Sequence, residues 1–145
     1  HRAALRALAR RAHARFDLRR RLLQKQHPPA AVEGALARLV AAGLLDDARF
    51  AADYAAAKAY RGRGPARLIR DLLALGIDRR VAEEAVQTSL ADEGIDPTRA
   101  VRALAEKRAR QLATLPAPVR KRRLTAFLVR RGFGGAEVRK VVDSI

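Results

Sequence analysis

Histidine is the side chain of this sequence best suited to bind a metal or transfer protons, and it occurs three times. We interpret His1, His13 and His27 as isolated, without a second metal ligand three or four residues away. Cysteine is absent, which excludes a disulfide framework, a thiolate zinc site and a cysteine nucleophile. The sequence therefore predicts no metal site and no bound cofactor.

Two acidic pairs are the remaining candidates for acid–base chemistry. Asp46 and Asp47 stand at the start of an expected helix, where aspartate caps free backbone amide groups. Glu83 and Glu84 are neighbours on a helix and point apart, which is typical of solvated side chains. We interpret neither serine of the chain as a nucleophile. We find no catalytic constellation and expect a protein that is not an enzyme.

Arginine is the residue whose abundance does suggest a function. The chain has 31 Lys and Arg against 15 Asp and Glu, a formal net charge of +16, and 26 of the basic residues are arginines. The planar guanidinium group binds phosphates and carboxylates through paired hydrogen bonds. A GC-rich genome also enriches arginine and alanine, but it does not explain why acidic residues fail to balance the charge. The composition predicts a polyanionic partner or an acidic protein surface.

Length and hydropathy limit the fold class. The 145 residues suffice for one domain or for a few small repeated units. Hydrophobic residues make up 49% of the chain and are mostly alanine and leucine, which favour helices. No apolar run approaches the about 20 residues that cross a bilayer, and arginines interrupt the amino end where a signal peptide would lie, so we expect a cytoplasmic protein. Because the chain begins at His1 instead of Met, we also expect a natural segment to precede it.

Glycine, proline and aspartate divide the sequence into nine expected helices. A glycine just after a helix adopts the left-handed conformation without a Cβ penalty, and an apolar residue then packs back on the last turn. Asp or Pro soon starts the next helix. The glycines at these helix-end turns are Gly43, Gly76, Gly94 and Gly132. The expected helices are 1–12, 17–26, 29–42, 47–61, 65–75, 78–91, 97–114, 118–131 and 135–143.

An internal repeat groups these helices by three. Leucine pairs spaced by four residues mark the middle helix of each group and recur with offsets of 50 and then 56 residues. Such a period is typical of repeat architectures. The sequence predicts an all-α fold, an elongated and curved array of three tandem three-helix repeats over 1–45, 46–95 and 96–145. The repeated core positions are Leu18, Leu22, Leu68, Leu72, Leu124 and Leu128.

The positive charge is concentrated in the first and third units. The first has 10 basic and 2 acidic residues, the second 8 and 9, and the third 13 and 4, which gives net charges of +8, −1 and +9. A solvated helix face explains any single arginine as well as a specific contact does, but each cluster as a whole favours binding. The candidate binding residues in these two units are Arg10, Arg11, Arg15, Arg19, Arg20, Arg108, Arg120, Lys121, Arg122, Arg123, Arg130 and Arg131.

One loop of the middle unit, residues 61–65, is a further candidate. Its sequence, Arg-Gly-Arg-Gly-Pro, lacks the Gly-Lys-Ser/Thr of a nucleotide-binding P-loop. The loop is either a tight connection into the next helix or a contact with a partner through its backbone and through Arg61, Arg63 and Arg67.

Aromatic residues are too few to suggest base stacking. They make up 4% of the chain, and we expect most of them in the core. Proteins that stack on single strands present sets of exposed aromatic side chains. The expected core aromatics are Phe16, Phe50, Tyr54, Phe127 and Phe133.

Ordered motifs extend over nearly the whole chain. They are Leu-Leu-Asp-Asp-Ala-Arg-Phe-Ala at 44–51, Arg-Gly-Pro-Ala-Arg-Leu-Ile at 63–69, Leu72 through Gly76-Ile77, and Phe-Leu-Val-Arg-Arg-Gly-Phe at 127–133. Together these motifs resemble the RecX family. Lys107 and Arg108 occupy the place of a basic pair in the long helix of that family's third unit. The sequence departs from the family at Gln26, where a glycine is frequent.

The resemblance implies a regulator of the RecA recombinase, usually an inhibitor, that is all-helical and not itself an enzyme. Such proteins bind the RecA–single-stranded DNA filament, lie along its helical groove and suppress strand exchange, ATP hydrolysis and co-protease activity. The implied partners are RecA and single-stranded DNA, with double-stranded DNA as a further one. We expect a monomer whose basic first and third units grip the filament and whose neutral middle unit is a spacer.

Two other binding functions fit the same residues. One is a helical protein that binds DNA or RNA directly, without sequence preference and without a recombinase partner. A helix-turn-helix reader would place Arg, Asn or Gln on one recognition helix, whereas this chain has no Asn and only four Gln. The other is a helical scaffold for acidic proteins.

Overall fold

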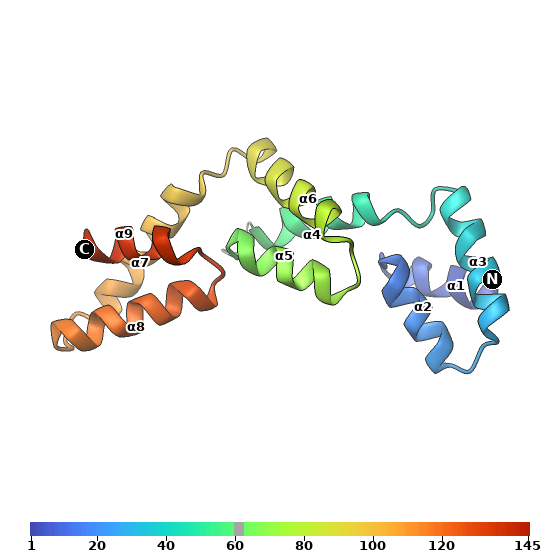
Figure 1. Cartoon of the computed structure of the whole chain (residues 1–145), viewed down its shortest axis with the longest axis horizontal. Helices are drawn as coiled ribbons and strands as arrows, with labels where there is room; N and C mark the ends of the chain where they lie inside the picture. Colours follow the sequence, from blue (N-terminus) through green and yellow to red (C-terminus); the bar gives the residue numbers. More distant parts are fainter. Residues whose placement is uncertain (60–62) are drawn as a thin grey trace.

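Figure 1 shows three groups of helices that follow one another along a bent row, with the two chain ends at opposite ends of the row. This computed structural model describes residues 1–59 and 63–145. Within those ranges there are nine α-helices and no strand, which confirms the predicted all-α, elongated, curved array of three tandem three-helix repeats. The helices are α1 (Arg2–Arg10), α2 (Arg15–Gln24), α3 (Pro29–Ala41), α4 (Asp47–Ala59), α5 (Pro65–Ala74), α6 (Arg79–Asp92), α7 (Pro97–Gln111), α8 (Ala117–Arg130) and α9 (Gly135–Asp143).

Each unit closes its own hydrophobic core around its middle helix. The six leucines of the repeat are all buried, with at most 5% of any one exposed. They fall into three separate clusters of buried residues, one for each group of three helices. A fully buried leucine side chain contributes about 1.5–3 kcal/mol to folding, so each unit depends mainly on its own core.

The aromatic residues follow the sequence expectation except at Phe16. Phe133 is buried, and Phe50, Tyr54 and Phe127 are partly buried against the cores of their units. Phe16 is 49% exposed, so its assignment to the core is wrong. It stands in the first turn of α2 and packs toward the neighbouring unit, a position that helical periodicity does not distinguish from a core position.

The second and third units are joined by backbone hydrogen bonds. The amide of Gly64 donates to the carbonyl of Arg131 at 2.6 Å, and the amide of Ala66 donates to the carbonyl of Gly132 at 3.1 Å. These amides lie at the start of α5, where an α-helix has no internal partner for its N–H groups. The turn that ends α8 therefore supplies hydrogen-bond acceptors for free amide groups at the start of α5, the middle helix of the preceding unit.

The first and second units meet through the equivalent elements. Phe16, at the start of α2, lies against Gly76 in the turn that ends α5. Ala14 is fully buried and belongs to the core cluster of the second unit. The amide of Arg15 donates to Oδ1 of Asp47 at 2.8 Å, so a side chain of α4 caps α2. The repeat thus extends to the junctions as well as to the cores.

A side chain is excluded at the turns that form these junctions. Gly76 and Gly132 have φ values of 82° and 96°, a region that favours glycine. A Cβ on Gly132 would lie 2.6 Å from the backbone nitrogen of Arg67, and one on Gly76 would overlap the side chain of Phe16. Gln26 holds the matching position of the first unit, with φ of 63° and an exposed side chain. The left-handed turn is therefore kept there without glycine.

Aspartate side chains cap the helices that follow the turns at Gly43, Gly76 and Gly94. Asp46, Asp78 and Asp96 accept hydrogen bonds from backbone amides two or three residues ahead, which confirms capping as the role of Asp46. Asp47 is also a cap, but for α2 of the neighbouring unit. No helix of the described residues is long and apolar enough to cross a membrane.

We predict that Leu72→Asp unfolds the middle unit. Leu72 is fully buried, and an unpaired carboxylate in an apolar core costs several kcal/mol. The matched control is Leu44→Asp, because Leu44 is 57% exposed and its replacement should leave the melting temperature nearly unchanged. Circular dichroism melts check this, and undiminished helicity with one sharp transition in the Leu72 variant would contradict the placement of α5.

We predict opposite effects at two equivalent turns. Gln26→Gly should stabilise the protein by about 0.5–1 kcal/mol, because it relieves a left-handed backbone in a residue with a Cβ. Gly132→Ala should destabilise it by more than about 1 kcal/mol, because the added methyl group meets the backbone of α5. Urea unfolding measures the change in the free energy of unfolding for each variant. Changes of the same sign would refute the equivalence of the two turns.

Candidate nucleic-acid interface

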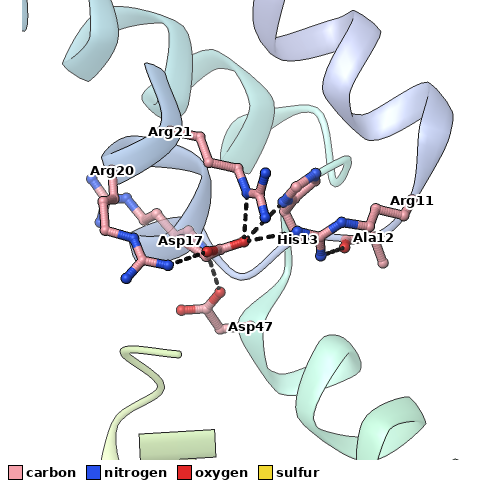
Figure 2. Close-up of polar contacts among 8 residues, drawn as sticks. Arg11, Ala12, His13, Asp17, Arg20, Arg21 and Asp47 are labelled. Carbon is pink, nitrogen blue, oxygen red and sulfur yellow. Dashed lines mark hydrogen bonds and ion pairs between the residues drawn. The ribbon is translucent and has the colours of Figure 1, made fainter. Parts of the chain in front are cut away.

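A buried carboxylate organises the basic residues of the first unit (Figure 2). Asp17, in the first turn of α2, is only 3% exposed. Its oxygens accept hydrogen bonds from Nη2 of Arg20 at 2.9 Å, Nδ1 of His13 at 3.0 Å and Nε of Arg21 at 3.3 Å. Nη2 of Arg11 lies 3.4 Å away. The Asp17 carboxylate thus contacts three arginines and one histidine, from the linker between α1 and α2 and from α2 itself.

The contact between His13 and Asp17 was missed in the sequence. His13 is 5% exposed and has a polar partner four residues later, so the expectation that it is isolated is wrong. The spacing of four residues at a helix start was the available signal. Among the described residues, there is no group of three His, Cys, Asp or Glu side chains that could hold a metal ion.

The arginines set the charge state of Asp17. Burial raises the pKa of its carboxyl group, but hydrogen bonds from His13, Arg20 and Arg21 outweigh this and hold the pKa below the ordinary value of 3.8. The carboxylate is therefore ionised in the folded protein at neutral pH, and a strong interaction with its cationic neighbours results.

Two other candidates of the first unit are also paired. Arg19 donates through Nε to Oε1 of Glu33 on α3, and Nη2 of Arg15 lies 4.0 Å from Oε2 of the same glutamate. These side chains are 44–52% exposed, so solvent screens the pairs. Arg10 is exposed and has no ion-pair partner among the described residues.

A cleft of about 500 Å³ lies between α1 and α2. Its floor is apolar and includes Leu18 and Leu22. Its walls carry five basic side chains and no carboxylate, which makes it attractive to an anion. The basic residues that line it are Arg6, Arg10, Arg11, Arg21 and Lys25.

Arg63 and Arg67, at and near the start of α5, contact groups of the protein itself. Nη1 of Arg63 lies 2.6 Å from Oδ2 of Asp71 and 3.2 Å from the hydroxyl oxygen of Tyr54. Burial and the neighbouring Asp71 raise the pKa of Tyr54, so its hydroxyl stays protonated and donates to the same carboxylate. Nη1 of Arg67 donates to the carbonyl of Arg130 at 3.4 Å. Arg61 lies outside the described residues.

The candidate cations of the third unit have few acidic partners. Lys121 pairs with Asp143 on α9 at 2.6 Å. Within the described residues, the other predicted cations of this unit form no ion pair. Arg122, Arg123 and Arg130 are exposed, whereas Arg108, Arg120 and Arg131 are partly buried. The third unit therefore presents its charge more openly than the first.

The guanidinium carbons of Arg108 and Arg131 both lie close to the ring of Phe127, at 5.2 Å and 5.3 Å from its centroid. Such cation–π contacts contribute about 0.5–1 kcal/mol each at exposed sites. They bring together the end of α7 with α8 and the turn that follows it. Residue spacing alone does not indicate this arrangement, because it depends on how α7 packs on α8.

Comparison with known proteins agrees with the repeat seen here. Family models for the first, second and third three-helix domains of RecX match residues 1–39, 46–86 and 96–142. A protein named regulatory protein RecX from Halorhodospira halophila is 38% identical over 138 residues, which cover 94% of this chain and 82% of the relative. The chain belongs to the RecX family. Another relative, regulatory protein RecX from Xanthomonas oryzae pv. oryzae, is 36% identical over 136 residues, with 94% and 82% of the two chains covered.

Solved structures of the RecX family have the same fold. The crystal structure of RecX from Lactobacillus salivarius superposes with a TM-score of 0.83 at 20% identity, over 99% of this chain and 92% of that one. A second crystal structure of a regulatory protein RecX gives 0.82 at 24% identity, over 96% and 69%. At these identities the likeness concerns the fold alone. The resemblance drawn from the sequence motifs is confirmed by the relatives and by this fold.

We predict that Asp17→Asn lowers the stability of the first unit by about 1–3 kcal/mol at neutral pH, because charge-assisted hydrogen bonds are lost. A lowered folded-state pKa contributes stability above the unfolded value of 3.8, which is lost as the pH falls through the folded value. The difference from wild type should therefore shrink below about pH 4.

Chemical unfolding between pH 2.5 and pH 7 measures this difference. Glu33→Gln is the matched control, because it also removes a carboxylate from paired arginines but at an exposed site, where less than about 1 kcal/mol is expected. An Asp17 effect that is equal to the control, or constant with pH, would show that the buried carboxylate does not organise this unit.

Proposed function

We propose that this protein regulates the RecA recombinase by binding the RecA–single-stranded DNA filament along its helical groove. It inhibits ATP hydrolysis, strand exchange and co-protease activity there. Membership of a family of regulatory proteins supports the general role. The observation that carries the finer proposal is the separation of two basic units, of net charge +8 and +9, by a neutral one in an elongated body.

The proposed contacts are made by the two ends of the molecule. The first unit, 1–45, and the third, 96–145, bind the filament, and the middle unit, 46–95, spaces them. Two weak contacts on a single body strengthen one another, because the first raises the effective concentration of the second. A filament has a regular succession of recombinase subunits and DNA phosphates, so an elongated protein can reach neighbouring subunits at once.

Bridging of this kind explains inhibition without any chemistry in the regulator. Recombinase subunits change their relative arrangement as ATP turns over, and a protein bound across them opposes that change. In this proposal the protein acts as a monomer in the cytoplasm, needs no cofactor and is not an enzyme. Its DNA contacts are to phosphates, on single strands and also on duplexes.

We predict that Arg122→Glu with Arg123→Glu weakens inhibition of RecA ATPase on single-stranded DNA. Both side chains are exposed and without an ion-pair partner in the described part of the chain, so charge reversal should not disturb the core. Half-maximal inhibition should need about tenfold more of the variant and depend less on salt concentration, because phosphate contacts are lost.

The matched control is Arg70→Glu with Arg80→Glu, which makes the same change of charge at exposed positions of the middle unit. It should inhibit nearly as well as wild type. If the two variants inhibit equally, the third unit does not bind the filament. If the wild-type protein binds DNA alone but leaves RecA ATPase unchanged at equal ratios, the protein is a general nucleic-acid-binding protein and the proposal fails.

A further inference from the structure

A cluster in the third unit combines one aromatic ring with two cationic groups. The guanidinium carbons of Arg108 and Arg131 lie 5.2 Å and 5.3 Å from the centroid of the Phe127 ring. We refer to these three residues as the Phe127 clamp. All three side chains are partly buried, at the place where α7 packs on α8. Two like charges thus share one ring in a position with reduced access to water.

The charges of the clamp are not neutralised. Nη1 of Arg108 donates to the neutral amide oxygen of Gln111 at 2.8 Å, and its Nε is buried without a hydrogen-bond partner. Neither arginine forms an ion pair within residues 1–59 and 63–145. The similarly half-buried Arg19 and Arg63 differ, because each has a carboxylate partner. Arg67 and Arg120 are also partly buried and without an ion pair in the described residues, so the clamp is distinguished by the shared ring and by the buried Nε of Arg108.

The backbone around Arg131 is fixed by the neighbouring unit. Its carbonyl accepts the amide of Gly64, and the carbonyl of the preceding Arg130 accepts Nη1 of Arg67. Gly132 follows with the constrained turn described above. The backbone of Arg131 thus belongs to the junction between two units, while its guanidinium group lies against the Phe127 ring.

Two partly desolvated cations without a counter-ion favour an anion between or beside them. The repulsion between like charges is larger where water is partly excluded, and a bound anion removes it. A buried N–H without a partner, like Nε of Arg108, also gains by meeting an acceptor. Phe127 holds the arginines in position, but its ring is occupied by them and is not free to stack on a base.

A phosphodiester fits these features better than a protein carboxylate. Nucleic-acid phosphates recur along a strand, so one strand can meet the clamp and the exposed Arg130 or Arg123 at the same time. The third unit has a net charge of +9, which attracts a polyanion from a distance. An isolated protein carboxylate would contact the clamp alone and would not reach the other arginines at the same time.

We propose that the Phe127 clamp is a phosphate-binding site for single-stranded nucleic acid, in which Arg108 and Arg131 hold the backbone and Phe127 positions them. The site reads no base. It deepens the proposed function, on which its place in a filament rests, but it binds a free strand without a recombinase.

The test measures binding of fluorescent oligonucleotides by anisotropy, with no recombinase present. Arg108→Gln with Arg131→Gln should weaken binding of an oligo-dT and an oligo-dA by the same factor, about tenfold. The slope of log K against log salt should fall by about 0.7 for each lost phosphate contact. The control Arg99→Gln with Arg139→Gln removes two exposed cations of the same unit and should change affinity by no more than about twofold.

Two further variants separate positioning from total charge. Phe127→Leu keeps every charge and an apolar side chain, and should weaken binding because the arginines lose the ring that orders them. If the variant with Arg108→Gln and Arg131→Gln has a lower melting temperature than the wild-type protein, the variant with Arg108→Lys and Arg131→Lys replaces it. That pair keeps both charges but loses the planar forks, and should still bind more weakly than the matching lysine pair at positions 99 and 139.

The proposal is overturned if the clamp variants and their controls bind the oligonucleotides equally. It is also overturned if a polyglutamate peptide competes as well as oligo-dT for the wild-type protein, since the site would then prefer carboxylates. A loss confined to oligo-dT or to oligo-dA would contradict binding through phosphates alone. None of these results depends on inhibition of RecA, so the clamp and the proposed function can fail separately.

Discussion

Left-handed glycine turns are the constraint on which the arrangement of the units depends. The turn at Gly132 lets the end of α8 approach the start of α5. The turn at Gly76 lets the end of α5 approach the start of α2. At the Gly132 turn, backbone carbonyls accept hydrogen bonds from free amides at the start of α5. At the Gly76 turn, the backbone packs against the side chain of Phe16. These close contacts join units whose hydrophobic clusters are separate.

The same junctions decide where the basic residues stand. Arg67 enters the contact between the second and third units through its guanidinium group, and Arg131 enters it through its backbone carbonyl. Arg15 enters the contact between the first and second units through its backbone amide. The junctions thus hold the backbone of Arg15 and Arg131 and the charged group of Arg67.

Acidic residues make the two basic ends unlike each other. In the first unit, Asp17 and Glu33 hold most of the candidate arginines in place. In the third unit, Lys121 has an acidic partner while the clamp arginines have a ring. The net charges of the two units are nearly equal, but one surface is organised by ion pairs and the other presents cations without counter-ions.

The sequence by itself determined the helices, their grouping by three and the family. Glycine, proline and aspartate mark helix ends by local backbone chemistry, and the leucine repeat marks the cores, so neighbouring residues carry that information. The exposure of Phe16 and the pairing of Arg63 with Asp71 were decided by tertiary structure alone, whereas the spacing of His13 and Asp17 already indicated their contact but not their burial. Charge counting cannot separate a paired arginine from a free one, because pairing depends on side chains that meet across helices, and the ring shared by Arg108 and Arg131 exists only once α7 packs on α8.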